Sequence, residues 1–140
     1  MDLKTLCCRL LLGAAALSTT LTVSGETITV GMSAALTGPA SELGNGVKVG
    51  IESYFSRVNA NGGVNGKPLV LDAMDDSYEP AKAAPNMNTL IDDKNVIAVM
   101  GNVGTPTAIV TVPIANEKKT LLFGAYTGAG TVIRDDVPPG

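Results

Sequence analysis

Short apolar segments alternate with longer segments of helical periodicity along most of the chain. The apolar segments are typical of buried strands and cover residues 27–32, 69–73, 96–100 and 121–123. Between the first two, apolar side chains recur at the spacing of one helix face: Val47, Ile51, Tyr54, Phe55 and Val58. Two more helices are expected, one from Pro80 toward residues 92–93 and one from Thr105 to about residue 117. The pattern therefore predicts strands and helices in regular alternation.

This alternation predicts the arrangement of the sheet. Connections that contain a helix join parallel strands, and the helices then cover both faces of the sheet. The expected fold class is therefore α/β, a doubly wound parallel sheet in the order 2-1-3-4. Ligands of such folds bind outside the carboxyl ends of the strands where the strand order reverses, between strands 1 and 3. The loops 34–44, 101–105 and 124–131 should meet at that point.

The loop after the third strand has the composition of a helix start. Gly101 and Gly104 turn the chain, Thr105 is the expected N-cap, and Pro106 is expected at the first helical position, where a missing N–H costs nothing. The N–H groups and the positive dipole end of such a helix attract a carboxylate or another anion. The simpler alternative is an ordinary strand-to-helix turn with a good cap.

Polar residues at the other strand ends have structural interpretations. Ser41 or Asn45 is expected to cap the first helix after a long loop, and Asp76 or Ser77 to cap the second. Asp75 is expected to hold its own loop. A metal or acid/base role for the aspartate pair is weaker, because no further ligand lies nearby in the sequence.

The helices carry features that bear on their packing. Tyr54 and Phe55 are expected in the core rather than as a stacking surface. Pro85 and Pro113 lie inside the second and third helices, where a missing backbone donor should kink or interrupt them.

Composition narrows the possible functions. The net charge of −3, the absence of a basic run and the aromatic content of 4% argue against nucleic acid as a partner. The chain has no histidine, which excludes His-based metal sites and Ser-His or Cys-His catalysis within it. No nucleotide motif is present, since residues 101–104 lack the G-x-G-x-x-G spacing and Gly66-Lys67 is followed by proline. We therefore expect no cofactor and no enzyme, but a small polar ligand held by hydrogen bonds.

The first 25 residues are typical of a secretory signal peptide. Lys4 and Arg9 flank a short polar start, residues 10–17 form an apolar run too short to span a bilayer, and small residues lead to a cleavage position near residues 25–26. Both cysteines precede the apolar run, so lipid attachment is not expected. The alternative is a buried N-terminal helix. The expected mature chain, residues 26–140, is an exported domain without cysteine.

Several segments in this order resemble one family. The segments are ITVGM at 28–32, LTGP at 36–39 with Gly44, VNANGGVNGK at 58–67, DDSYEP at 75–80 and VMGNVGTPT at 99–107. Together they resemble the substrate-binding proteins of branched-chain amino acid ABC transporters, the Leu/Ile/Val-binding or type I periplasmic binding family. The resemblance implies a periplasmic, two-lobed receptor that closes on an amino acid or small amide and delivers it to an ABC permease of the inner membrane.

The resemblance also implies site residues. In that family the loop after strand 3 holds the ligand carboxylate through a hydroxyl and backbone amides, and the matching residues here are Gly104, Thr105 and Thr107. In the loop after strand 4, Thr127 is the best match. Its neighbours Tyr126 and Gly128 lie within the ambiguity of the alignment, and Leu43 matches a pocket position in the first loop that is often aromatic.

The chain departs from the family in length. Members have a second lobe, which largely supplies the acidic residue that binds the ligand ammonium. Residues 26–140 are therefore expected to be a partial N-terminal lobe, from a truncated product or fragment. A ligand-sensing domain of a receptor or regulator with the same fold is the alternative function. An enzyme that uses Asp75, Asp76 or the Thr105 hydroxyl is disfavoured, because no base accompanies the hydroxyl.

Overall fold

The computed structural model describes residues 26–129 of the chain. The predicted signal peptide and the end of the predicted 124–131 loop lie outside the described residues. The elements follow in this order: β1 (Ile28–Ala34), α1 (Ser41–Ala60), β2 (Leu69–Asp75), α2 (Pro80–Asn88), the π-helix η1 (Thr89–Asp93), β3 (Ala98–Met100), α3 (Thr105–Glu117) and β4 (Leu121–Phe123). None of the described helices combines the length and the hydropathy that a membrane crossing requires.

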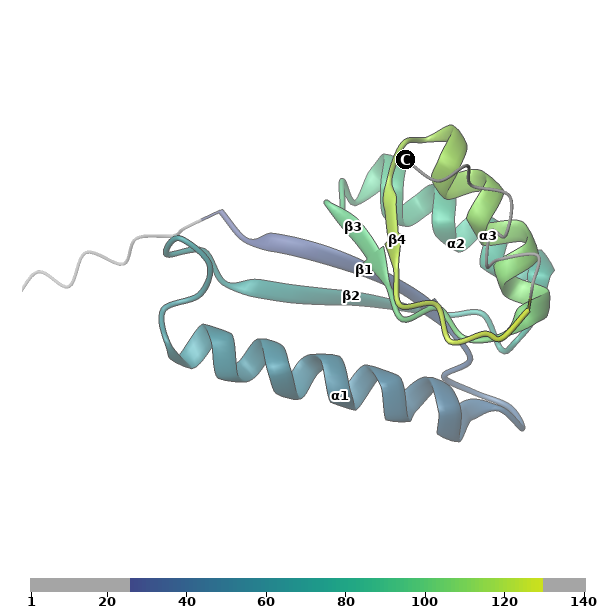
Figure 1. Ribbon diagram of the computed structural model, residues 1–140, viewed down its shortest axis with the longest axis horizontal. Coiled ribbons are helices and arrows are strands. Elements are labelled where there is room, and N and C mark those ends of the chain that lie inside the picture. Colours follow the sequence, from purple (N-terminus) through teal and green to yellow (C-terminus); the bar gives the residue numbers. More distant parts are fainter. Residues whose placement is uncertain (1–25, 130–140) are drawn as a thin grey trace, which may run out of the picture.

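The strands form one parallel sheet in the predicted order, β2-β1-β3-β4 (Figure 1). β1 and β2 pair along their whole length, from Ile28 opposite Leu69 to Ala34 opposite Asp75. β3 is much shorter, and its pairing with β4 runs from Ala98 opposite Leu121 to Met100 opposite Phe123. The strand order reverses between β1 and β3, so the carboxyl end of β1 is the place where a ligand of this fold class is expected.

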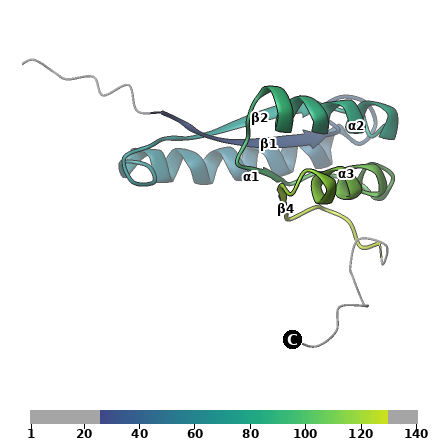
Figure 2. The same ribbon diagram turned by 90° about the horizontal axis from the view of Figure 1, so that it is seen from above.

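Helices cover both faces of the sheet. α1 lies along one face and packs on β2, whereas α2 and α3 lie side by side on the other face (Figures 1 and 2). On the α1 side, Met32 and Val103 are buried, and Val47 and Ile51 of α1 pack against them. This packing explains why the apolar stripe of the sequence forms a helix, since most of the stability of a helix in a protein comes from the packing of its apolar face.

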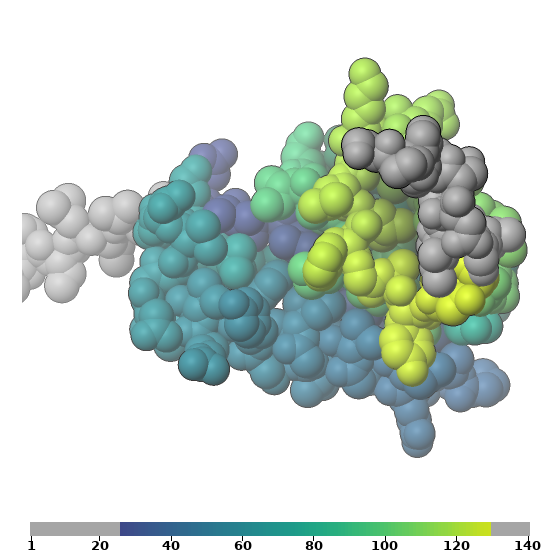
Figure 3. Space-filling model, viewed as in Figure 1, coloured from purple at the N-terminus to yellow at the C-terminus, as the bar shows by residue number. Residues whose placement is uncertain are grey.

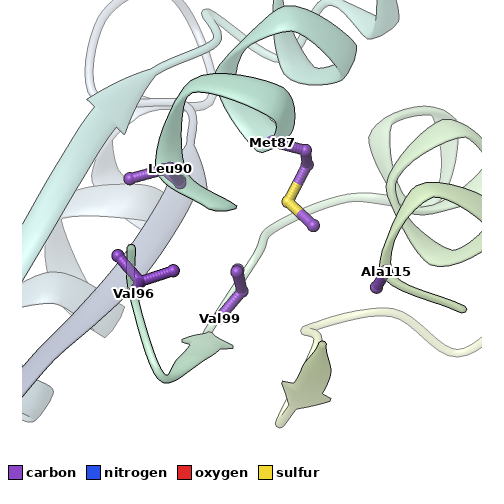
Figure 4. Packing of buried hydrophobic residues seen from close by; sticks show 5 residues of the cluster. All are labelled: Met87, Leu90, Val96, Val99 and Ala115. Atoms are coloured by element: carbon purple, nitrogen blue, oxygen red, sulfur yellow. The ribbon is translucent and has the colours of Figure 1, made fainter. Parts of the chain in front are cut away.

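A second apolar cluster fills the space between the sheet and the other two helices. It consists of Met87, Leu90, Val96, Val99 and Ala115, which come from α2, η1, β3 with the residues before it, and α3 (Figure 4). Full burial of a side chain such as leucine or methionine contributes about 1.5–3 kcal/mol. The cluster therefore fixes the position of α3, whose first turn faces the loop after β3.

The first helix begins earlier than predicted. α1 starts at Ser41 and its N-cap is Ala40, without a side-chain cap bond, so the predicted capping by Ser41 or Asn45 is wrong. The Asn45 amide instead donates to carbonyl oxygens of the loop and of the first turn, at 3.1 and 2.8 Å. Gly44 explains the close approach of that turn to the loop. A Cβ there would lie 3.2 Å from the Ala35 nitrogen, and closer still to its carbonyl group.

Two predictions about the other helices are also wrong. The N-cap of α2 is Glu79 rather than Asp76 or Ser77, because both aspartate carboxylates bind groups earlier in the loop. Pro85 and Pro113 lie within continuous helices, so the predicted interruption of these helices is wrong, whereas the predicted kink stays a prediction. Each proline removes a single hydrogen bond, and the buried side chains of the same helices hold both in place.

The prediction that Tyr54 packs in the core is wrong. Its side chain is 64% exposed, whereas the neighbouring Phe55 is buried. Successive residues of a helix point about 100° apart, and α1 contacts the sheet only along a narrow stripe. The stripe includes Phe55 and leaves Tyr54 on the solvent side.

Candidate ligand-binding site

Two loops at the carboxyl end of the sheet are joined backbone to backbone. The Gly101 N–H donates to the Phe123 carbonyl at 3.0 Å, the Tyr126 N–H donates to the Asn102 carbonyl at 2.7 Å, and the Gly104 N–H donates to the Tyr126 carbonyl at 3.1 Å. These bonds continue the β3–β4 pairing past the ends of both strands. Figure 3 shows β4 and the loop after it, in yellow, at the surface of this face of the molecule.

The joined loops bring two threonine hydroxyls together. The Oγ1 atoms of Thr105 and Thr127 lie 2.9 Å apart, and the Ala129 N–H donates to Thr127 Oγ1 at 3.2 Å. Thr105 and Thr127 are the predicted hydroxyl residues of the two loops, so the structure places both in one hydrogen-bonded group. Such a pair offers a ligand one hydroxyl donor and further acceptor positions.

The start of α3 differs from the prediction in one respect. The N-cap is Gly104, with φ +108°, and Thr105 is the first helical residue, so the predicted N-cap role of Thr105 is wrong. Its hydroxyl is therefore not used as a cap. Pro106 has no N–H, and the N–H groups of Thr105 and Thr107 have no hydrogen-bond partner among residues 26–129. Two unpaired donors at a helix N-terminus are suited to an anionic group.

Thr107 lies beneath this surface. Its side chain is fully buried, and its Oγ1 donates to the carbonyl oxygens of Val103 and Gly104, at 2.7 and 3.0 Å. The hydroxyl thus stabilises the turn that precedes α3. Unlike its hydroxyl, the backbone N–H of Thr107 has no hydrogen-bond partner in the described residues.

Leu43, Tyr126 and Gly128 are exposed. Leu43 belongs to the first turn of α1 and is 48% exposed, and Tyr126 and Gly128 belong to the loop after β4. The backbone of Tyr126 joins the two loops, whereas its side chain is 59% exposed. The structure therefore groups Gly104, Thr105, Tyr126 and Thr127 by hydrogen bonds and places Leu43 on a separate element.

Asp75 holds its own loop, as predicted, and it also fixes the first loop to the end of β2. Its carboxylate accepts hydrogen bonds from the Leu36 N–H at 2.8 Å, from the Thr37 N–H and hydroxyl at 3.1 and 2.5 Å, and from the Ser77 N–H at 2.9 Å. Burial alone would raise the pKa of Asp75, but the Thr37 hydroxyl and three backbone N–H groups outweigh it and hold that pKa well below its ordinary value. The carboxylate is therefore a structural anchor.

A buried polar network lies behind the site. The Ser33 hydroxyl donates to Asp76 Oδ2 at 2.8 Å, and the Ser33 N–H donates to Asn102 Oδ1 at 3.1 Å. The Asn102 amide in turn contacts the Met87 sulfur at 3.5 Å. Burial raises the pKa of Asp76, although hydrogen bonds from Ser33 and from the Tyr78 N–H act in the opposite direction. Ser33 thus connects the loops of both strands that flank β1.

Sequence reasoning missed Asn102 and Tyr78. Asn102 stands between the two glycines of the loop, and its position just past a strand end was the only available signal. Tyr78 packs its ring against Gly104, where a Cβ would lie 2.8 Å from Tyr78 Cζ and closer still to Cε2. No periodicity indicates that contact.

Metal chemistry has no support in the described part of the chain, which holds no group of three or more candidate ligand side chains suited to a metal ion. The arrangement is one of hydroxyls and N–H groups at a helix start, which can hold a ligand by hydrogen bonds. The arrangement lies at the carboxyl ends of the strands, where ligands of parallel α/β folds bind.

A family model described as periplasmic binding protein matches residues 27–138. The chain therefore belongs to the periplasmic binding protein family, a family of substrate-binding proteins. This confirms the family resemblance inferred from the sequence.

Individual relatives agree with this assignment. Leu/Ile/Val-binding protein homolog 3 of Brucella melitensis is 34% identical over 95 residues, which cover 68% of this chain and 26% of that protein. Leu/Ile/Val-binding protein BraC3 of Rhizobium johnstonii is 33% identical over 89 residues, which cover 64% of this chain and 23% of that protein. The chain thus spans about a quarter of the length of these relatives.

Solved structures show the same fold. A possible leucine/isoleucine/valine-binding protein from Rhodopirellula baltica is 49% identical with a TM-score of 0.76, and the match covers 80% of this chain and 30% of that one. The substrate-binding protein LivJ of Streptococcus pneumoniae, solved in complex with isoleucine, is 26% identical with a TM-score of 0.67 and coverages of 74% and 30%.

Proposed function

We propose that this chain is part of the extracytoplasmic solute-binding component of an ABC transporter for branched-chain amino acids, related amino acids or small amides. The observation that carries the proposal is the start of α3. There, the Thr105 N–H, which has no partner in residues 26–129, adjoins the Thr105–Thr127 hydroxyl pair. An amino acid presents a carboxylate, and N–H and hydroxyl donors at a helix N-terminus are suited to bind it.

Each predicted site residue receives a role in this proposal. The Thr105 hydroxyl and N–H bind the ligand carboxylate, and the buried Thr107 supports them because its hydroxyl holds the turn before α3. The Thr127 hydroxyl orients Thr105 or joins it on the ligand, and Gly104 supplies the φ of +108° that turns the chain into the helix. Tyr126 and Gly128 form the rim on the β4 side, and the exposed Leu43 contacts the ligand side chain from α1.

The proposal extends to the organisation of the whole protein. Residues 1–25 act as a signal peptide, residues 26–140 form part of the N-terminal lobe, and the protein works in the periplasm with a permease of the inner membrane. Support comes from the relatives, which are named as Leu/Ile/Val-binding proteins and of which this chain spans about a quarter.

A second function follows from one relative. A chemotactic signal transduction system substrate-binding protein, BasB of Halobacterium salinarum, is 32% identical over 113 residues, which cover 78% of this chain and 27% of that protein. The same site would then serve a ligand-sensing domain of a receptor or regulator. Binding of the same ligands is expected in both cases, so a deletion of the gene separates them. A transport component is needed for uptake, and a sensor for the response to the ligand.

Calorimetric titration of the complete gene product with leucine, isoleucine, valine and a small amide tests the proposal. Thr105→Val keeps the shape of the side chain and removes its hydroxyl. A hydrogen bond to a charged group contributes about 1.5–3 kcal/mol, so affinity should fall roughly tenfold to a hundredfold. Thr120→Val is the matched control, because within residues 26–129 the Thr120 hydroxyl bonds only the Lys118 carbonyl at the far end of α3. Equal affinities of parent and Thr105→Val would refute the assigned role, and no binding to any compound would refute the proposal.

A further inference from the structure

Ser33 places two loops on either side of the end of β1. Its hydroxyl bonds Asp76, which follows β2, and its N–H bonds Asn102, which follows β3. All three side chains are buried. The two loops are therefore both bound to Ser33 beneath the candidate site. A second contact between them, nearer the surface, would fix their positions relative to one another.

Tyr78 makes that second contact. Its ring covers Gly104, where a Cβ would lie 2.8 Å from Cζ and 3.1 Å from Cδ2. Gly104 is buried although it belongs to a surface loop, whereas Tyr78 is 37% exposed. The ring thus shields the residue whose backbone turns directly into the first helical position of α3.

The backbone around Tyr78 is held in an uncommon conformation to achieve this. Ser77 and Tyr78 are consecutive residues with positive φ, +50° and +67°, a conformation that residues other than glycine rarely adopt. Asp75 and Asp76 hold them there, since the carboxylate of each accepts the N–H two residues further on, both at 2.9 Å. Strained residues that the surroundings fix in this way are concentrated at functional sites.

We propose that Tyr78 is a positioning residue of the ligand-binding site, and that its ring holds the Gly104 backbone so that the first N–H groups of α3 point at the ligand. This inference rests on the proposed function for its effect on binding. The Tyr78 ring acts through Gly104 rather than through its hydroxyl, which has no hydrogen-bond partner among residues 26–129. The aromatic ring is therefore the required feature.

Two variants of Tyr78 separate positioning from direct contact. In the complete gene product, Tyr78→Ala should weaken isoleucine binding about tenfold. Tyr78→Phe, which keeps the ring, should bind isoleucine with the parental affinity. Tyr54→Ala is the matched control, because that tyrosine is exposed on α1, and it should leave the affinity unchanged. A parental affinity in Tyr78→Ala would overturn the proposal. An equal loss in Tyr78→Phe would also overturn it, because the hydroxyl would then contact the ligand.

A double-mutant cycle tests the contact without any ligand. Gly104→Ala should lower the midpoint of thermal unfolding in the parent more than in the Tyr78→Ala background, by about 4 °C or more, because the clash exists only when the ring is present. Equal shifts in both backgrounds would overturn the positioning role. If the parent binds no ligand while the cycle shows coupling, the proposed function and the binding role of Tyr78 fail, and only the loop contact stands.

Discussion

Substitution of Gly101 by alanine probes the point where β3 passes into the candidate site. Gly101 has φ +70°, which an L-residue with a side chain adopts only at a cost. A Cβ there would lie 2.8 Å from Val47 Cγ1 and 2.9 Å from Ile51 Cδ1, both on α1. The variant therefore perturbs the backbone of the loop and the packing of the helix together.

The expected magnitude is the sum of these effects. The left-handed conformation costs an alanine about 1–2 kcal/mol, and overpacking against two side chains of α1 adds about 1–3 kcal/mol. Alanine also has less conformational freedom than glycine in the unfolded chain, which stabilises the folded state by about 0.4–1 kcal/mol. The net loss is about 1–4.6 kcal/mol, which corresponds to a fall of at least about 4 °C in the midpoint of thermal unfolding for a domain near 100 residues.

Circular dichroism of the purified full chain on heating measures this shift. Gly50→Ala is the matched control, because Gly50 lies on α1 and a Cβ there meets nothing within 4 Å. That change should stabilise the chain by about 0.5–1 kcal/mol, since alanine favours a helix over glycine. A midpoint for Gly101→Ala within about 2 °C of the parent would refute the described loop conformation or its contact with α1.

The two neighbouring aspartates should respond to pH in opposite directions. Because the pKa of Asp75 is lowered in the folded chain, Asp75→Asn should destabilise it at pH 7 by about 1–3 kcal/mol, and the difference should shrink as the pH falls below about 4. The pKa of Asp76 is raised by burial, so the stability that Asp76 contributes to the folded chain decreases as the pH rises above about 4. The stability of Asp76→Asn should therefore increase relative to the parent over the same rise in pH. Urea unfolding at pH 3, 5 and 7 measures both, and a pH dependence of the same sign in the two variants would contradict the assigned pKa directions.

The sheet order could be predicted from the sequence because it depends on a few strong constraints. Connections with helices require parallel strands, and the apolar segments are short enough to be strands only. The boundaries were less predictable. β2 continues to Asp75, two residues beyond the predicted end, since its last residues pair with Ser33 and Ala34 of the longer β1. A partner strand extends a strand in a way that no local pattern indicates.

The capping predictions failed for a related reason. Asp76 and Ser77 have the composition of helix caps, but their hydrogen bonds lead elsewhere. Asp76 bonds Ser33, 43 residues earlier in the chain, and Ser77 bonds Asp75. A capping preference describes a residue in the absence of tertiary partners, and here the partners compete successfully.

The candidate site was partly accessible to sequence reasoning. The proximity of Thr105 and Thr127 follows from the adjacency of β3 and β4, which the predicted order contains. The contact of Tyr78 with Gly104 could not be predicted, because it depends on two consecutive left-handed residues held by carboxylates. The burial of Thr107 depends on the direction of one side chain at the start of a helix, which spacing does not define.

The central place of β1 in the sheet has a kinetic consequence. β1 can pair with β2 as soon as the intervening helix forms, but its other neighbour follows much later, with Asn102 lying 69 residues after Ser33. Until β3 arrives, one edge of β1 offers unpaired N–H and carbonyl groups to any passing strand. Closing that long loop costs entropy before any contact compensates it. We therefore expect the docking of β3, which also completes the loop at the candidate site, to be the slow step of folding and the stage at which the chain is most open to misassembly.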